Sequence, residues 1–181
     1  GQRRIPAHWK CKVGFDVGYS EGQHPHWSAW TFIAAAAENS AVPNAIFLYR
    51  SRGFKGVSLD DQADAIKAEL YPEEMQMVTS WQMSHERTGE MLTLRNKYAL
   101  PFTKFAHYRA EDGVPQWRHL SRCDHSQPHP FKEDELFEDG TWRLGRPQLF
   151  YIVDDDQSVT PADDAGHKLF RDQVSSWNYV K

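Results

Sequence analysis

The fold is decided by one stretch near the start of the chain, Lys12-Val13-Gly14-Phe15-Asp16-Val17-Gly18-Tyr19-Ser20. Val13, Phe15 and Val17 alternate with other residues at the period of two that is typical of a β-strand, so we expect a first strand over about 11–18. This strand delivers one carboxylate, Asp16, into a glycine-containing turn. Strand ends hold side chains rigidly, and Mg²⁺ and Mn²⁺ prefer carboxylate oxygens. We therefore interpret Asp16 as a metal ligand. The alternative is an aspartate that only accepts backbone hydrogen bonds within its own turn.

The next segments predict a strand meander followed by a helix. β-Type residues resume at about 28–37 and again at 45–50, and the links between them are rich in turn-forming residues. Ser58 is a suitable N-cap for a helix over 59–70, which has acidic residues in its first turn and an apolar stripe. Three consecutive strands with short links predict an antiparallel meander.

The second half of the chain alternates predicted strands and helices. We expect strands at about 75–81, 102–106 and 147–153, and helices at about 86–98, 114–120 and 163–177. The polar residues 124–146 are interrupted by prolines and glycines and predict an inserted loop or small hairpin. Residues 1–10 form a lead-in segment. The sequence thus predicts a single α/β domain over 1–181, with a mixed sheet flanked by helices.

Composition limits the classes of protein that the chain can represent. With 181 residues, of which 40% are hydrophobic, it can bury one substantial core. The net charge of −4 means that nucleic-acid binding requires local basic patches. Cys11 and Cys123 do not make a disulfide framework, and neither a signal peptide nor an apolar stretch of about 20 residues is present. We therefore expect a soluble intracellular protein, and the start at Gly1 instead of methionine suggests part of a longer one.

Several stretches carry a resemblance to a known family. They are Ile5-Pro6-Ala7-His8-Trp9, Gly14-Phe15-Asp16-Val17-Gly18-Tyr19, Phe105-Ala106-His107-Tyr108-Arg109-Ala110-Glu111-Asp112-Gly113-Val114, Pro147–Val153 and Leu169–Val180. Together with the order of the predicted elements, they resemble the C-terminal nuclease domain of the large terminase subunit of tailed bacteriophages. This family belongs to the ribonuclease H-like superfamily, so the resemblance implies a mixed sheet with an antiparallel three-strand meander followed by βα units.

The resemblance also implies an activity, a cofactor and partners. It implies a metal-dependent endonuclease that uses Mg²⁺ or Mn²⁺, with two ions in a complete site, to cut concatemeric viral DNA during packaging. Its implied partners are double-stranded DNA, the ATPase domain of the same parent chain, the portal and the small terminase subunit, and no membrane. The implied location is the cytoplasm of an infected or lysogenic bacterium. No Gly-x-x-x-x-Gly-Lys-[Ser/Thr] phosphate loop occurs in the chain, so we expect the ATPase domain to lie outside it.

Three positions of the implied metal site are expected in this chain or beyond it. Asp16 corresponds to the first acid. The second is expected at the end of the fourth strand, which falls at about Ser80, where no carboxylate is present. Glu86 and Glu90 are the nearest acids after it. The third cluster is expected on a helix beyond Lys181.

Other side chains suggest additional binding sites. Lys104, Arg109, Arg118 and Arg122 are candidates for a local basic edge that contacts DNA phosphates, with a surface balanced by nearby acids as the alternative. Cys123, His125 and His129 are at a spacing that suits zinc, with Cys11 or another histidine as a fourth ligand. Further candidate ligands are the loop histidines His24 and His26 and the acids Asp154, Asp155 and Asp156. We favour the simpler interpretations, which are exposed loop side chains for the histidines and a solvated turn for the acids.

Two other functions remain open from the sequence. One keeps the fold without the chemistry, as a DNA-binding or portal-docking module whose metal site has decayed. The other is an unrelated ribonuclease H-like nuclease of the resolvase or integrase type. The terminase nuclease hypothesis needs carboxylates that converge on Asp16, whereas the decayed module needs none.

Overall fold

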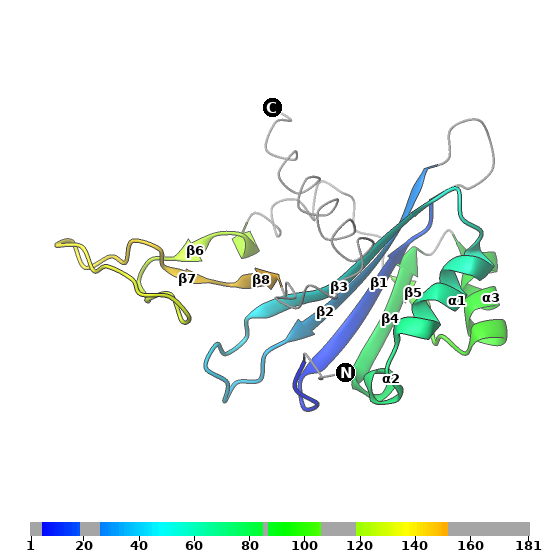
Figure 1. Ribbon diagram of the computed structural model, residues 1–181, viewed down its shortest axis with the longest axis horizontal. Helices are drawn as coiled ribbons and strands as arrows, with labels where there is room; N and C mark the ends of the chain where they lie inside the picture. Colours follow the sequence, from blue (N-terminus) through cyan, green and yellow to red (C-terminus); the bar gives the residue numbers. More distant parts are fainter. Residues whose placement is uncertain (1–4, 19–25, 85–86, 106–118, 152–181) are drawn as a thin grey trace.

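The computed structural model describes residues 5–18, 26–84, 87–105 and 119–151. A six-stranded sheet has the strand order β5-β4-β1-β2-β3-β8 (Figure 1). Its strands are β1 (Lys10–Asp16), β2 (Trp27–Ala35), β3 (Ile46–Lys55), β4 (Val78–Ser84), β5 (Thr103–Phe105) and β8 (Leu149–Tyr151). Three helices, α1 (Leu59–Glu69), α2 (Pro72–Met77) and α3 (Thr88–Tyr98), lie in the chain between these strands. A separate two-stranded sheet consists of β6 (Cys123–Asp124) and β7 (Arg146–Pro147).

The strand directions define the class of fold. β1 pairs antiparallel with β2, and β2 pairs antiparallel with β3. β4 then joins the other edge of β1 in the parallel direction, and β5 joins β4 in the same way. An antiparallel meander followed by two parallel strands on its β1 edge, linked through helices, is the ribonuclease H-like arrangement expected from the sequence, which is confirmed. β8 adds a further parallel strand beside β3.

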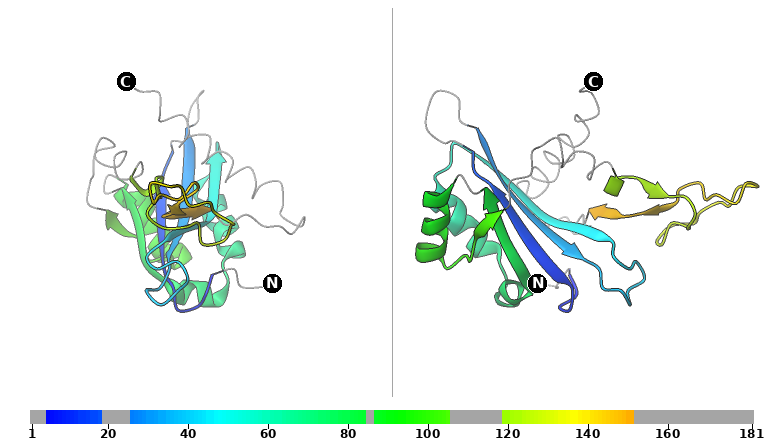
Figure 2. Two further views of the ribbon diagram at one scale, coloured as in Figure 1. Left: turned by 90° about the vertical axis from the view of Figure 1, so that its left-hand side faces the viewer. Right: turned by 180° about the vertical axis from the view of Figure 1, so that it is seen from behind.

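One face of the sheet carries the core. Residues of β1 alternate strictly, so that Cys11, Val13 and Phe15 are buried while their neighbours are exposed. The buried faces of β1, β2 and β4 share this layer, where the Phe15 ring stacks on Trp30 with centroids 3.9 Å apart. Ile66 of α1 and Leu94 of α3 belong to the same core. The described helices therefore cover this face, as Figure 2 shows from two further directions.

Helix α1 forms where the sequence places it. The Ser58 hydroxyl accepts a hydrogen bond from the backbone N–H of Asp61 at 3.1 Å, which satisfies one of the free donors of the first turn. The helix buries Gln62, whose side-chain oxygen accepts a hydrogen bond from the indole Nε1 of Trp30 at 3.2 Å. A buried polar side chain is thus satisfied and joins α1 to β2.

The region before β4 differs from the expectation. The sequence predicted a strand over 75–81, but residues up to Met77 belong to α2 and β4 runs from Val78 to Ser84. Pro72 occupies the first turn of α2, and the Glu74 carboxylate accepts a hydrogen bond from the backbone N–H of Tyr71 at 3.4 Å, so both residues favour the start of a helix here. The apolar run was too short for its periodicity to separate helix from strand.

Some expected elements lie outside the described residues. These are the helix at 163–177, most of the helix at 114–120 and the end of the strand at 147–153. Among the residues that the structure describes, no helix is long and apolar enough to cross a membrane.

Candidate functional site

Asp16 ends the central strand β1 and is exposed on the face opposite the core. It pairs with Ala29 of β2 and follows the buried Phe15. Since successive side chains of a strand point to opposite faces, Asp16 leaves the sheet on the side away from α1 and α3. A carboxylate at this point is held by a strand that has hydrogen-bonded neighbours on both edges.

The end of β4 lies beside the end of β1. Phe15 pairs with Met83 in the parallel register, and one further residue along both strands places Asp16 next to Ser84. The expectation that the strand-four position falls at about Ser80 is wrong, because Ser80 pairs with Lys12, well before the end of the strand. The misplaced start of β4 is the reason for this error. His85 and Glu86, which follow Ser84, lie outside the described residues.

The face beside Asp16 is open at Gly14. Gly14 precedes Asp16 by two residues on the same face, and a Cβ atom added to it would meet no atom of the described residues within 4 Å. Exposed Lys10 and Lys12 continue this face along β1. The sheet thus presents a row with two ammonium groups, an open glycine position and then the Asp16 carboxylate. Sequence reasoning did not propose Lys10 and Lys12, although their alternation with buried residues was the available signal.

The turn after Asp16 is fixed by close packing. The backbone N–H of Gly18 donates a hydrogen bond to the Ser28 hydroxyl at 3.0 Å, and buried Ser28 also accepts one from Gln62 at 3.3 Å. A Cβ atom at Gly18 would overlap the carbonyl oxygen of Trp27. Glycine is therefore required here by the approach of two backbone segments, and this contact fixes the direction in which the chain leaves Asp16.

The Gly18→Ala variant is expected to lose about 1–3 kcal/mol of unfolding free energy, because the added methyl group has to displace backbone atoms. Urea unfolding followed by tryptophan fluorescence measures this loss. Gly14→Ala is the matched control in the same strand region, since its methyl group would contact no described residue. Equal stability of the Gly18 and Gly14 variants would contradict the proposed packing of the turn.

The other candidate DNA contacts are distributed unevenly. Lys104 is exposed on β5, but its pairing with the buried Met83 places it on the helix-bearing face of the sheet, not on the face of Asp16. Arg109 and Arg118 lie outside the described residues. Arg122 is exposed immediately before β6. Glu90 lies in the first turn of α3 and forms an ion pair with Arg87 at 3.7 Å.

The candidate zinc ligands do not converge. Cys11 is fully buried in the core, and this burial raises the pKa of its thiol, which opposes formation of the thiolate that a metal requires. Nδ1 of His125 lies 2.7 Å from the carbonyl oxygen of Trp142, and Nδ1 of His129 accepts a hydrogen bond from the backbone N–H of Phe131. No group of three or more histidine, cysteine or acidic side chains within the described ranges is arranged to hold a metal ion.

Taken together, the strand order and directions define a ribonuclease H-like domain, with an exposed aspartate at the end of its central strand. No family model and no curated protein matches the chain. Among solved structures, it is similar to the large terminase nuclease domain from the bacteriophage SPP1, which was crystallised with bound Mn. The two chains share 14% sequence identity with a TM-score of 0.44, over 60% of this chain and 54% of that one. This chain spans about half of the length of that solved domain.

Proposed function

We propose that the chain is a metal-dependent DNA endonuclease, and that it serves as the nuclease domain of a phage or prophage terminase that cuts DNA during packaging. The observation that carries this proposal is the position of Asp16. It is the exposed carboxylate at the end of the central strand, next to the end of the parallel strand β4. The strand ends of an α/β sheet are where polar side chains from neighbouring strands come together.

A phosphodiester nuclease needs groups that activate water and stabilise the leaving oxygen, and divalent metals supply both. Asp16 offers one carboxylate ligand, which is fewer than Mg²⁺ or Mn²⁺ requires from a protein site together with substrate and water. Since β4 ends at Ser84, the nearest following carboxylate in the sequence is Glu86. We propose Glu86, in place of the position at Ser80, as the second acid.

The basic residues on the face of Asp16 support DNA as the substrate. Lys10 and Lys12 are exposed there, and ammonium groups contact phosphates without reading the base sequence. They are therefore proposed to position the DNA backbone along β1 toward Asp16. Arg109 and Arg118 remain proposed DNA contacts from the sequence. Lys104 is proposed to contact the phosphates of DNA that passes over the β5 edge of the sheet.

Metal removal tests the proposed activity. Purified protein is expected to convert supercoiled plasmid to the nicked and linear forms in Mn²⁺ or Mg²⁺, to lose this activity completely in EDTA, and to regain it when the metal is restored. Agarose gels of a time course measure the conversion. Cleavage that persists in EDTA would contradict a metal-dependent reaction.

The decayed-module alternative has its own supporting observation, since no group of three or more histidine, cysteine or acidic side chains within the described residues is arranged to hold a metal ion. It predicts plasmid binding in a gel-shift assay without cleavage in either metal. If the folded protein binds plasmid without cleaving it, the decayed-module alternative replaces the nuclease proposal.

A further inference from the structure

Residues 123–147 form a long projection, here called the arm. Strands β6 and β7 pair antiparallel at its base, Cys123 with Pro147 and Asp124 with Arg146. The arm extends away from the six-stranded sheet, on the side opposite the helices (Figures 1 and 2). It is therefore presented to solvent along most of its length.

The arm is held in one conformation by its own hydrogen bonds. The carboxylate of Asp134 accepts hydrogen bonds from the backbone N–H groups of His129, Glu135, Leu144 and Gly145, at 2.7 to 3.0 Å. Desolvation opposes the charged form of this carboxyl, but the four donors outweigh it and lower the pKa of Asp134. Asp139 similarly accepts from the backbone N–H and the hydroxyl of Thr141.

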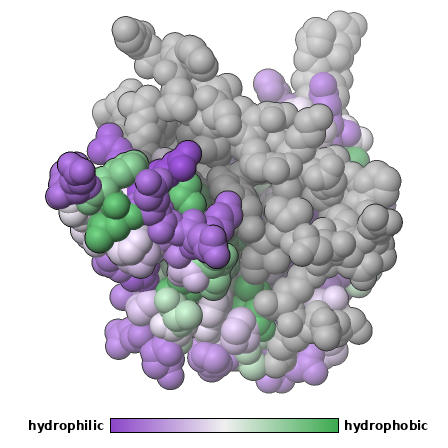
Figure 3. All heavy atoms as spheres, turned by 60° about the vertical axis from the view of Figure 1, so that its left-hand side comes forward, coloured by the Kyte–Doolittle hydropathy of each residue, from purple (hydrophilic) through white to green (hydrophobic). Residues whose placement is uncertain are grey.

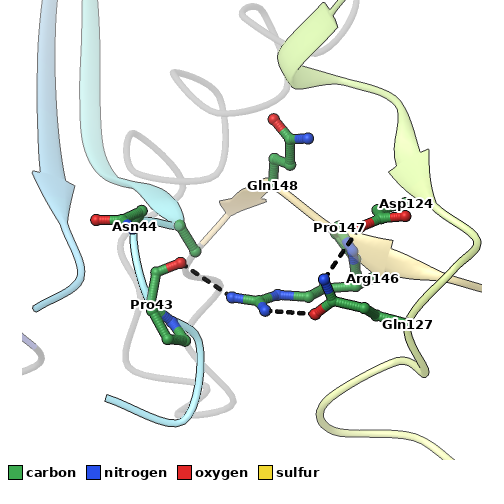
Figure 4. Close-up of a pocket in the computed structure, with 8 residues that line it drawn as sticks. Pro43, Asn44, Asp124, Gln127, Arg146, Pro147 and Gln148 are labelled. Carbon is green, nitrogen blue, oxygen red and sulfur yellow. Dashed lines mark hydrogen bonds between the residues drawn. The ribbon is translucent and has the colours of Figure 1, made fainter. Parts of the chain in front are cut away.

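The base of the arm is fixed to the sheet. The guanidinium of Arg146 donates hydrogen bonds to the Pro43 carbonyl oxygen at 2.9 Å and to Oε1 of Gln127 at 2.7 Å (Figure 4). These residues line a polar cavity of about 220 Å³ between the arm and the turn before β3. The backbone N–H of Ile46 also donates to the Gln148 carbonyl at 2.8 Å, just beyond the arm. The projection is thus anchored as well as internally ordered.

This ordered arm exposes large apolar side chains. Eight large hydrophobic residues of the described chain are exposed, and half of them lie in residues 131–144. They are Phe131, Leu136, Phe137 and Leu144, with exposed fractions of 61%, 56%, 45% and 39%. Figure 3, with the side that bears the arm turned forward, shows apolar surface among hydrophilic side chains. Exposed apolar patches mark interaction sites. When they lie on a rigid segment, little conformational entropy is lost as a partner buries them.

The charge of the arm specifies the chemistry of that partner. Residues 123–147 contain six carboxylates and three basic side chains, a net charge of −3. Such a surface repels DNA phosphates, and it complements a basic protein surface. We infer that the arm is a docking element for a protein whose binding surface combines lysine or arginine side chains with apolar side chains. This inference does not depend on the metal chemistry of Asp16.

Selection from a random peptide library on the immobilised whole protein tests the inference, followed by fluorescence anisotropy with the enriched peptides. The expected peptides pair lysine or arginine with apolar residues. Their binding is expected to weaken about tenfold or more in Phe137→Ser, because a buried aromatic anchor carries a large share of binding energy. Glu138→Lys is expected to weaken binding as well, and added salt to reduce the affinity for the wild type.

Leu92→Ser is the matched control, since Leu92 lies on α3, away from the arm, and is 45% exposed like Phe137. It is expected to bind the peptides as the wild type does. Peptides that lack a basic bias, or that bind all variants equally, would overturn the inference. So would binding of a DNA duplex that is lost in Phe137→Ser. Self-association in sedimentation that disappears in this variant would identify a second copy as the occupant and overturn the inference likewise.

Discussion

The Asp16→Asn variant is expected to nick supercoiled plasmid in Mn²⁺ at least about a hundredfold more slowly than the wild type. Asparagine keeps the shape of the side chain and removes its charge, so a metal ion loses an anionic ligand at the end of β1. A bound metal contributes several kcal/mol of transition-state stabilisation, and each 1.36 kcal/mol corresponds to a tenfold change in rate. Initial rates of plasmid conversion at matched protein concentration measure the effect.

Asp64→Asn is the control for this variant. Asp64 is exposed on α1, so the same chemical change occurs away from the face of Asp16 and is expected to leave the rate unchanged. Thermal unfolding of both variants at the wild-type temperature would show that the fold is intact. Wild-type cleavage by a folded Asp16→Asn protein would mean that the nuclease centre lies elsewhere.

The Glu74→Gln variant is expected to lose about 3–5 kcal/mol of unfolding free energy, since it removes the charge of a buried carboxylate that pairs with the largely buried Arg50. Glu74 is buried, and its two oxygens accept hydrogen bonds from Arg50 at 2.9 and 3.1 Å. Arg50 also donates to the backbone carbonyl of Glu69 at 3.2 Å and lies over the ring of Phe32. Chemical denaturation with urea measures the loss.

An exposed ion pair provides the comparison for Glu74→Gln. Lys97 and Asp60 approach to 2.7 Å, but both side chains are at least half exposed, so water and salt screen their attraction. Asp60→Asn is therefore expected to change stability much less than Glu74→Gln. Similar losses in the two variants would contradict the importance assigned to burial of the Arg50–Glu74 pair.

The sequence predicted the elements that are specified by local sequence patterns. The alternation through β1 and the capping of α1 by Ser58 depend on nearest neighbours, and both are found in the structure. The ribonuclease H-like sheet followed from the order of these elements. Asp16 was predicted as a candidate metal ligand because a strand and a glycine turn flank it in the sequence, and only its position at the end of β1 is observed in the structure.

The incorrect prediction of a strand over 75–81 has a physical cause that is visible in the sequence. Tyr71-Pro72-Glu73-Glu74 has proline and acidic residues where a helix begins, and this signal outweighs the apolar character of the residues that follow. Recognising α2 would have moved the fourth strand to its observed position and the second-acid position beyond Ser84. Short apolar runs leave this choice to their flanking residues.

Features that depend on distant contacts were not predictable in the same way. The four donors that converge on Asp134 come from both sides of the arm, so no local pattern identifies this carboxylate as the organiser of the segment. The anchoring of Arg146 to Pro43 joins residues that are far apart in the sequence. Such contacts form only when the tertiary fold brings the segments together.

Direct titration with Mn²⁺, followed by the electron paramagnetic resonance signal of the free ion, measures whether Asp16 binds a divalent metal. The wild-type protein is expected to bind Mn²⁺ saturably, and Asp16→Asn to bind it at least about tenfold more weakly, whether or not DNA is present. Equal binding by folded wild-type and Asp16→Asn proteins, or no binding by the wild type, would contradict the assignment of Asp16 as a metal ligand.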